Sequence, residues 1–150
     1  MKTARIDISK VSPKAYQPLF DLYNNCKNSS LKSNEFLLIE IRASQINGCA
    51  YCIQMHIKEA IEKGEKQYRI HALSTWKDSP FFTEQEQIIL EMTEEITHIS
   101  HHGLSDDLYE KAINTFGKEK VADIIMAICG INAWNRIGVA TLLEPIPSQE

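Results

Sequence analysis

The chain has 150 residues, of which 43% are hydrophobic and 24% are charged, and these values predict one soluble globular domain over residues 1–150. A net charge of -4 and the lack of a basic run argue against nucleic acid or an anionic membrane surface as partner. The first ten residues lack the apolar core of a signal peptide, and no apolar run approaches a membrane span. We therefore expect a cytoplasmic protein with no membrane partner.

Four cysteines define the redox chemistry open to the chain: Cys26, Cys49, Cys52 and Cys129. Structural disulfides are rare in a reducing compartment, where a close cysteine pair is more often catalytic or metal-binding. Cys26 and Cys129 have no cysteine nearby in the sequence. We expect each of these two to be a small buried hydrophobic residue.

Apolar residues recur at helical spacing along most of the chain, with short breaks between the periodic segments. The run "FLLIEI" could also be a buried strand, but the length of its segment before Gly48 favours a helix. No alternating strand pattern with Asn-Gly or Asp-Gly turns occurs. The sequence therefore predicts an all-α, compact helical bundle. Helices are expected at about residues 13–27, 34–46, 49–63, 69–76, 83–100, 105–116 and 118–143.

The stretch "NGCAYCIQMH" places two cysteines and a histidine on one face of the helix expected at residues 49–63. Cys49 and Cys52 are three residues apart, and His56 follows Cys52 by one turn. Cys49 lies near the helix N-terminus, where free N–H groups and the helix dipole lower a thiol pKa. A thiolate reduces peroxides and attacks disulfides, and a second thiol nearby converts the resulting sulfenic acid into a disulfide.

Other interpretations of this stretch stay open on spacing alone. A thioredoxin-like protein also uses two cysteines at this spacing, but on a βαβ framework that is missing here. The three side chains could also be a buried structural group. A structural zinc site needs four ligands, of which Cys49, Cys52 and His56 supply three. The fourth would have to come from one of the other histidines, which form no matching second ligand pair: His71, His98, His101 and His102.

Two neighbours of the cysteines are expected to be structural. The side chain of Asn47 precedes Gly48 at the predicted helix end, where it would act as a cap. Tyr51 lies between the cysteines but points away from their face under helical periodicity, so we expect it to contribute to packing.

"IRASQINGCAYCIQMH", residues 41–56, resembles the core motif of the alkylhydroperoxidase D-like proteins in the carboxymuconolactone decarboxylase superfamily. The similarity extends through "LSTWKDSPFFTEQEQIIL" and "INAWNRIGVA", so it covers about residues 14–143. It implies an all-helical fold that forms homo-oligomers, commonly trimers or hexamers. It also implies thiol peroxidase activity on organic or hydrogen peroxides, with no metal or flavin cofactor. The resemblance does not fix the thiol reductant, for which a lipoyl group and a thioredoxin-type protein are both candidates.

The resemblance also implies a role for each residue of the motif. Cys52 would attack the peroxide, Cys49 would be its resolving partner, and His56 would belong to a proton relay. This assignment reverses the helix-dipole argument, which favours Cys49 as the more acidic thiol. We follow the family assignment because His56 lies one turn from Cys52.

One position departs from the family pattern. The better-studied members of the family carry a relay glutamate twelve residues before the first cysteine, and here that position is Leu37, which cannot carry a proton. Glu35 lies two residues earlier and Glu40 three residues later. Glu40 faces nearly the same side of the helix as Leu37, so we expect Glu40 to replace the missing carboxylate.

The sequence therefore predicts a peroxidase that uses Cys49, Cys52, His56 and Glu40. The intact cysteine pair points away from decarboxylation, because the decarboxylases of this superfamily lack it. The alternative is a redox-sensing or disulfide-exchange protein with weak or no peroxidase turnover.

Overall fold

The computed structural model describes residues 4–145, which contain helices and no strand. The all-α class predicted from the sequence is therefore confirmed, and most expected helix boundaries agree to within one or two residues. The elements are α1 (Ile8–Val11), α2 (Pro13–Lys27), α3 (Ser33–Asn47), α4 (Ala50–Glu62), α5 (Gln67–Ala72), the 3₁₀ helix η1 (Leu73–Asp78), α6 (Glu84–Thr97), α7 (Ile99–His102) and α8 (Asp106–Thr141).

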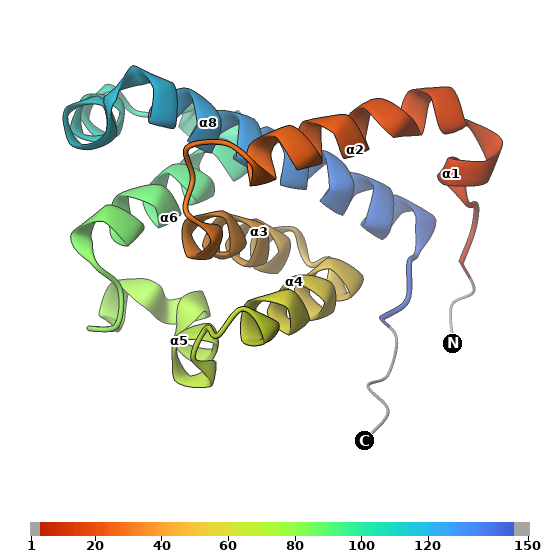
Figure 1. The fold of residues 1–150 in the computed structure, drawn as a ribbon, viewed down its shortest axis with the longest axis horizontal. Coiled ribbons are helices and arrows are strands. Elements are labelled where there is room, and N and C mark those ends of the chain that lie inside the picture. The colour runs from red at the N-terminus through yellow and green to blue at the C-terminus, as the bar shows by residue number, and fades with distance from the viewer. Residues whose placement is uncertain (1–3, 146–150) are drawn as a thin grey trace.

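Helix α3 occupies the centre of the bundle. In Figure 1 it lies between α2 and α8 on one side and α4 on the other, with α6 beside it. Phe36 to Ile41 are six consecutive buried residues, so α3 buries its whole circumference rather than one stripe. Ile39 faces a core shared with α6 and α8, whereas Leu38 faces a second core shared with α4, α5 and η1. This central position explains why "FLLIEI" has no helical periodicity.

Helix α8 is long but is interrupted at Gly117, whose φ of 78° and ψ of 167° are open essentially to glycine alone. The interruption lies where two separate helices were expected. By length and composition α8 would suffice to cross a membrane, but a core helix of a soluble protein passes the same test. Ile124, Ile128 and Ile131 of α8 are buried in the bundle core.

Two expectations about single positions are wrong. The helix expected at residues 83–100 ends at Thr97, because His98 leaves the helical region of φ and ψ before the short helix α7 begins. Cys129 is exposed rather than buried. It follows Ile128, which faces the core, and the helical rotation of about 100° per residue carries Cys129 toward solvent. Cys26 is buried, as expected.

Candidate active site

The turn between α3 and α4 positions the cysteine pair. Gly48 ends α3 with a φ of 66°, the left-handed cap predicted from the sequence. The N–H of Cys49 then donates to the carbonyl of Ser44 at 3.1 Å, which turns the chain back toward α3. Cys49 is the N-cap of α4, and its sulfur accepts the N–H of Cys52 at 3.4 Å. A disulfide joins the two cysteines across a Cα–Cα distance of 5.3 Å.

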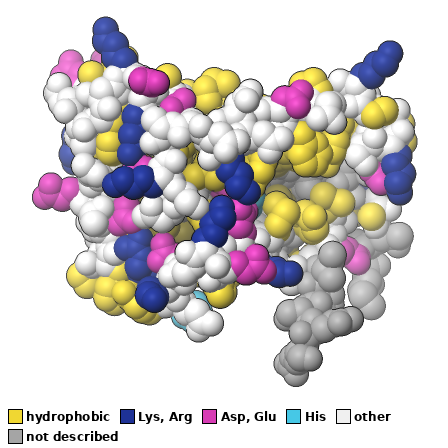
Figure 2. Space-filling model, viewed as in Figure 1, with side chains coloured by type: hydrophobic (Ala, Val, Ile, Leu, Met, Phe, Trp, Pro, Cys, Tyr) yellow, Lys and Arg dark blue, Asp and Glu magenta, His cyan; other side chains and the backbone are white. Residues whose placement is uncertain are grey.

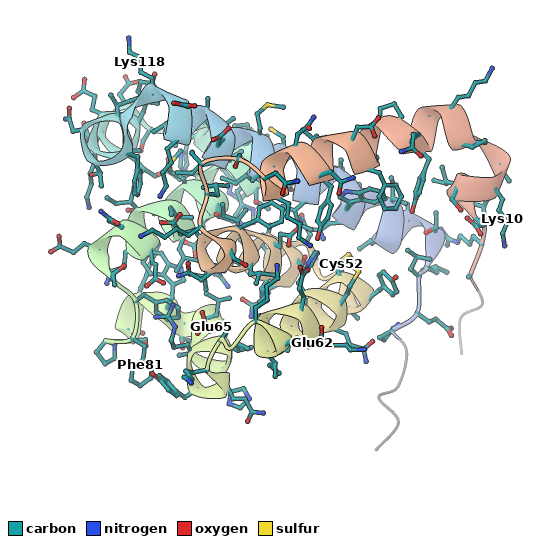
Figure 3. The ribbon with its side chains drawn as sticks, viewed as in Figure 1. Lys10, Cys52, Glu62, Glu65, Phe81 and Lys118 are labelled. Atoms are coloured by element: carbon teal, nitrogen blue, oxygen red, sulfur yellow. A yellow bond between two sulfur atoms is a disulfide. The ribbon has the colours of Figure 1, made fainter. Side chains whose placement is uncertain are left out.

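The two sulfur atoms lie against helix α8. Cys49 and Cys52 are 2% and 3% exposed, and Figure 3 shows Cys52 at the start of α4, facing α2 and α8. The residue of α8 at this contact is Gly138. A Cβ atom there would lie 2.9 Å from the sulfur of Cys49 and 3.4 Å from that of Cys52. The absence of a side chain at Gly138 therefore lets α8 approach the disulfide closely.

Replacing Gly138 with alanine is expected to destabilise the oxidised protein by about 1–3 kcal/mol, because the new methyl group overlaps a sulfur that the disulfide holds in place. Urea denaturation of the oxidised protein measures this loss. The matched control is Gly130→Ala on the same helix, where a Cβ would meet Leu22 at an ordinary distance of 3.6 Å. Alanine favours the helix over glycine, so the control should be neutral or stabilising. Equal effects of the two substitutions would contradict the close contact.

Glu40 and His56 form a buried pair behind the cysteines. Oε2 of Glu40 lies 3.0 Å from Nδ1 of His56, and both side chains are 2% exposed. Neither atom has another hydrogen-bonding partner among residues 4–145. Burial raises the pKa of Glu40, and the contact with His56 lowers it only in part. The pair can therefore share a proton out of contact with bulk water.

The other two positions considered for the relay have different surroundings. Leu37 packs into the core that α3 shares with α4, α5 and η1. Glu35 is also buried, but its carboxylate accepts the N–H of Lys32 and the ammonium of Lys120, each at 2.8 Å. Glu35 therefore caps α3 and pairs with α8. Of the two glutamates, Glu40 is the one that contacts His56.

A cavity of about 240 Å³ opens beside Cys52 and His56. Five of its eleven lining residues are Tyr, Phe or Trp. Three of these rings pack edge to face with centroids 5.0–5.3 Å apart: Tyr16, Phe20 and Trp134. In the view of Figure 2, hydrophobic side chains gather on the right half of the molecule, over α2 and the beginning of α4. Tyr51 lines the cavity together with Cys52, although helical periodicity points it away from the face of the cysteines. Cys49 is not among the lining residues, whereas Cys52 is.

Asn47 does not act as a helix cap through its side chain, contrary to expectation. Its amide donates to Oδ1 of Asn132 and of Asn135 on α8, at 3.1 and 3.0 Å. Asn135 in turn donates to the hydroxyl of Ser44 at 2.9 Å. Gly48 already caps the C-terminus of α3, so the side chain of Asn47 is available for this contact. The network fixes the α3–α4 turn against α8 and so holds the cysteines in place.

Glu59 is a further charged residue of the site that the sequence analysis missed. It lies three residues after His56 on α4 and also lines the cavity. Glu40, His56 and Glu59 each present an atom able to bind a metal within 4.8 Å of those of the other two. However, the ammonium groups of Lys27 and Lys63 both contact Glu59 at 2.8 Å, and their charge opposes a cation there. The spacing of His56 and Glu59 on one helical face could have revealed this residue.

Comparison with known proteins places the chain in a family. The family model for the carboxymuconolactone decarboxylase family matches residues 13–95, which include the cysteine motif. The chain belongs to the carboxymuconolactone decarboxylase family. Within it, the chain is 35% identical to the uncharacterized protein YdfG of Bacillus subtilis (strain 168), over 91% of this chain and 92% of that protein.

Solved structures are similar to the chain over most of its length. A putative antioxidant defence protein AhpD from Agrobacterium tumefaciens, itself of unknown function, is 37% identical with a TM-score of 0.94, over 97% of this chain and 100% of that one. The protein is therefore an AhpD-like member, as the resemblance implied. The debrominase Bmp8 shares the fold at 16% identity with a TM-score of 0.81, over 91% of this chain and 74% of its own. The fold thus occurs with another activity.

Proposed function

We propose that the protein is a thiol-dependent peroxidase that reduces organic or hydrogen peroxides through Cys49 and Cys52. The observation that carries this proposal is the position of Cys52, which lines an apolar cavity next to the buried Glu40–His56 pair. A nucleophile, a proton carrier and an enclosed space for a small substrate thus meet at one place. Membership of an AhpD-like branch supports the same reaction class.

The proposed reaction has two steps, reduction of the peroxide by Cys52 and formation of the disulfide with Cys49. The Cys52 thiol gives its proton to the Glu40–His56 pair, and the thiolate attacks the terminal peroxide oxygen. The O–O bond breaks, Cys52 becomes a sulfenic acid, and the leaving alkoxide takes the proton back from the pair as an alcohol. The Cys49 thiol then attacks the Cys52 sulfur, which forms the disulfide and releases water. An external dithiol must supply two electrons to restore the thiols.

The surroundings of the sulfur atoms favour turnover with a small substrate over exchange with a bulky protein thiol. Both sulfurs are almost fully buried, so a partner must reach them through the cavity. A peroxide or a dithiol on a slender arm, such as a lipoyl group, meets this requirement better than a thioredoxin-type protein surface. We expect the cycle to run in the cytoplasm.

We also expect the protein to act as a homo-oligomer, a trimer or a hexamer. An apolar groove on another face supports this expectation, because it is lined by Ile96, Ile99, Leu104 and Ile125.

The test is single-turnover mixing of the fully reduced protein with cumene hydroperoxide. We expect two thiols to disappear for each hydroperoxide consumed, with one cumyl alcohol formed and a disulfide between Cys49 and Cys52 identified by peptide mass mapping. Hydroperoxide loss at the rate of free cysteine in solution would refute the peroxidase. Rapid exchange with a dithiol in that case would support the redox-sensing alternative.

A further inference from the structure

Beyond the pair itself, one charged side chain faces the proton carrier from the cavity side. We propose that Glu59 is a positioning residue whose charge, held between two lysines and the buried pair, determines how readily the Glu40–His56 pair holds its proton. This inference rests on the proposed function for its role in catalysis, but not for its effect on the pair.

The backbone brings the three groups together from two helices. His56 and Glu59 lie three residues apart on α4, so both project from the same face. Glu40 comes from α3, which packs against α4. Their polar atoms lie within 4.8 Å of one another, and at such distances a charge changes the proton affinity of its neighbour substantially.

The carboxylate of Glu59 is held asymmetrically. Its Oε1 accepts hydrogen bonds from Lys27 and Lys63, each at 2.8 Å. Its Oε2 lies 3.5 Å from the hydroxyl of Tyr23. Both cations therefore bind the same oxygen, and the second oxygen faces Tyr23. Glu59 thus contacts the two lysines and also lies within 4.8 Å of the buried pair.

Charge at Glu59 acts directly on the pair. Partial burial would raise the pKa of Glu59, but the hydrogen bonds from Lys27 and Lys63 prevail and lower it to about 2, so Glu59 is ionised at neutral pH. This negative charge disfavours a second one on Glu40, which adds to the effect of burial in raising the pKa of Glu40. Lys27 acts in the opposite direction on Glu40. The proton affinity of the pair thus depends on the balance between Glu59 and the two lysines.

Two helices supply the titratable groups around the pair. Among the described residues, those that line the cavity or contact Glu59 are Tyr51, Cys52 and Glu59 on α4, Lys63 at the end of α4, and Tyr16, Tyr23 and Lys27 on α2, whereas α8 lines the cavity with Trp134 and Ile137. Burial raises the pKa of Tyr23 to about 12, so its hydroxyl stays neutral. Among residues 4–145, Glu59 is thus the one ionised carboxylate that lines the cavity.

The test follows the titration of the pair through the His56 ring resonances in the oxidised protein, which needs no peroxide turnover. We expect Glu59→Gln to move the midpoint to lower pH by about one unit, because it removes a negative charge and leaves two lysines. Lys27→Met should move the midpoint the other way. The matched control is Glu62→Gln, one turn further on α4, because its side chain is 63% exposed and Figure 3 shows it on the side of α4 opposite Cys52.

Two results would overturn the proposal: an unchanged midpoint in Glu59→Gln, or shifts of the same sign in Glu59→Gln and Lys27→Met. A purely structural role of Glu59 would not give opposite shifts. The pH profile of cumene hydroperoxide reduction then tests the link to catalysis, and its acid limb should move with the midpoint. Shifted midpoints in a protein that reduces no hydroperoxide would refute the proposed function and leave the effect of Glu59 on the pair intact.

Discussion

Cys52→Ser is expected to lower the rate of hydroperoxide reduction by at least about 10³-fold, because it removes the attacking sulfur. Cys49→Ser should leave the first step nearly unchanged and stop the protein at the sulfenic acid. The reason is that Cys52 lines the cavity, whereas Cys49 lies behind it as the N-cap of α4. Stopped-flow kinetics measures the first step, and trapping with dimedone followed by mass spectrometry identifies the sulfenic acid.

The exposed thiol of Cys129 could react slowly with peroxide and obscure a low residual rate. Both variants are therefore compared in a Cys129→Ser background, with that single variant as the control. A full first-step rate in Cys52→Ser, together with its loss in Cys49→Ser, would reverse the assignment. Cys49 would then be the nucleophile, as the helix-dipole argument favours.

Glu40→Gln is expected to lower the rate of hydroperoxide reduction at pH 7 by about 10²–10⁴-fold, because an amide cannot take up the thiol proton. The same substitution should not destabilise the protein at that pH. The wild-type Glu40 carboxylate is buried, and its partner is His56 rather than a lysine or an arginine. Burying its negative charge therefore costs free energy, whereas the glutamine amide carries no charge. A variant that loses activity while it keeps or gains stability is typical of a residue retained for function.

The pH dependence of stability gives a second measure of the same residue. The folded-state pKa of Glu40 is raised above its ordinary value of 4.5, so the folded protein binds this proton more tightly than the unfolded chain. The contribution of Glu40 to stability is therefore most favourable below pH 4.5 and declines as the pH rises toward the folded-state pKa. Urea denaturation should show Glu40→Gln gaining stability relative to the wild type as the pH rises above 4.5.

Glu35→Gln is the matched control, since Glu35 is also a buried carboxylate of α3 but pairs with Lys120. It should cost about 1–3 kcal/mol by weakening that pair, with little change in the rate of hydroperoxide reduction. A Glu40→Gln rate within twofold of the wild type would show that the pair is not the proton carrier.

The sequence was sufficient for the helices because their ends carry local signals. Gly48, Gly64 and Gly103 all adopt positive φ at the predicted breaks. Thr83 and Glu86 form a capping box at the start of α6, which a Thr followed three residues later by a Glu indicates. Such signals act within a few residues of the chain, so periodicity and turn chemistry reveal them.

The site was predictable in part for the same reason. The spacing of Cys49, Cys52 and His56 requires only one helix, and the contact of Glu40 with His56 follows once α3 and α4 pack together. The catalytic role of Glu40 stays a prediction. The surroundings of the Asn47 and Tyr51 side chains were not predicted, because they come from α8 and α2, which are distant in the sequence. Helical periodicity gives the direction in which a side chain points, but not the residues of other helices that it contacts.

The disulfide closes a loop of only a few residues, since its cysteines are three positions apart at the start of one helix. In the loop-entropy account a cross-link stabilises a folded chain less as its loop shortens, with about 2 kcal/mol for four residues against about 5 kcal/mol for a hundred. Opening the bond therefore releases little chain entropy, and the two buried cores do not depend on it. We therefore expect the fold to persist in both the dithiol and the disulfide state, whereas opening a cross-link between distant helices would cost the fold more stability.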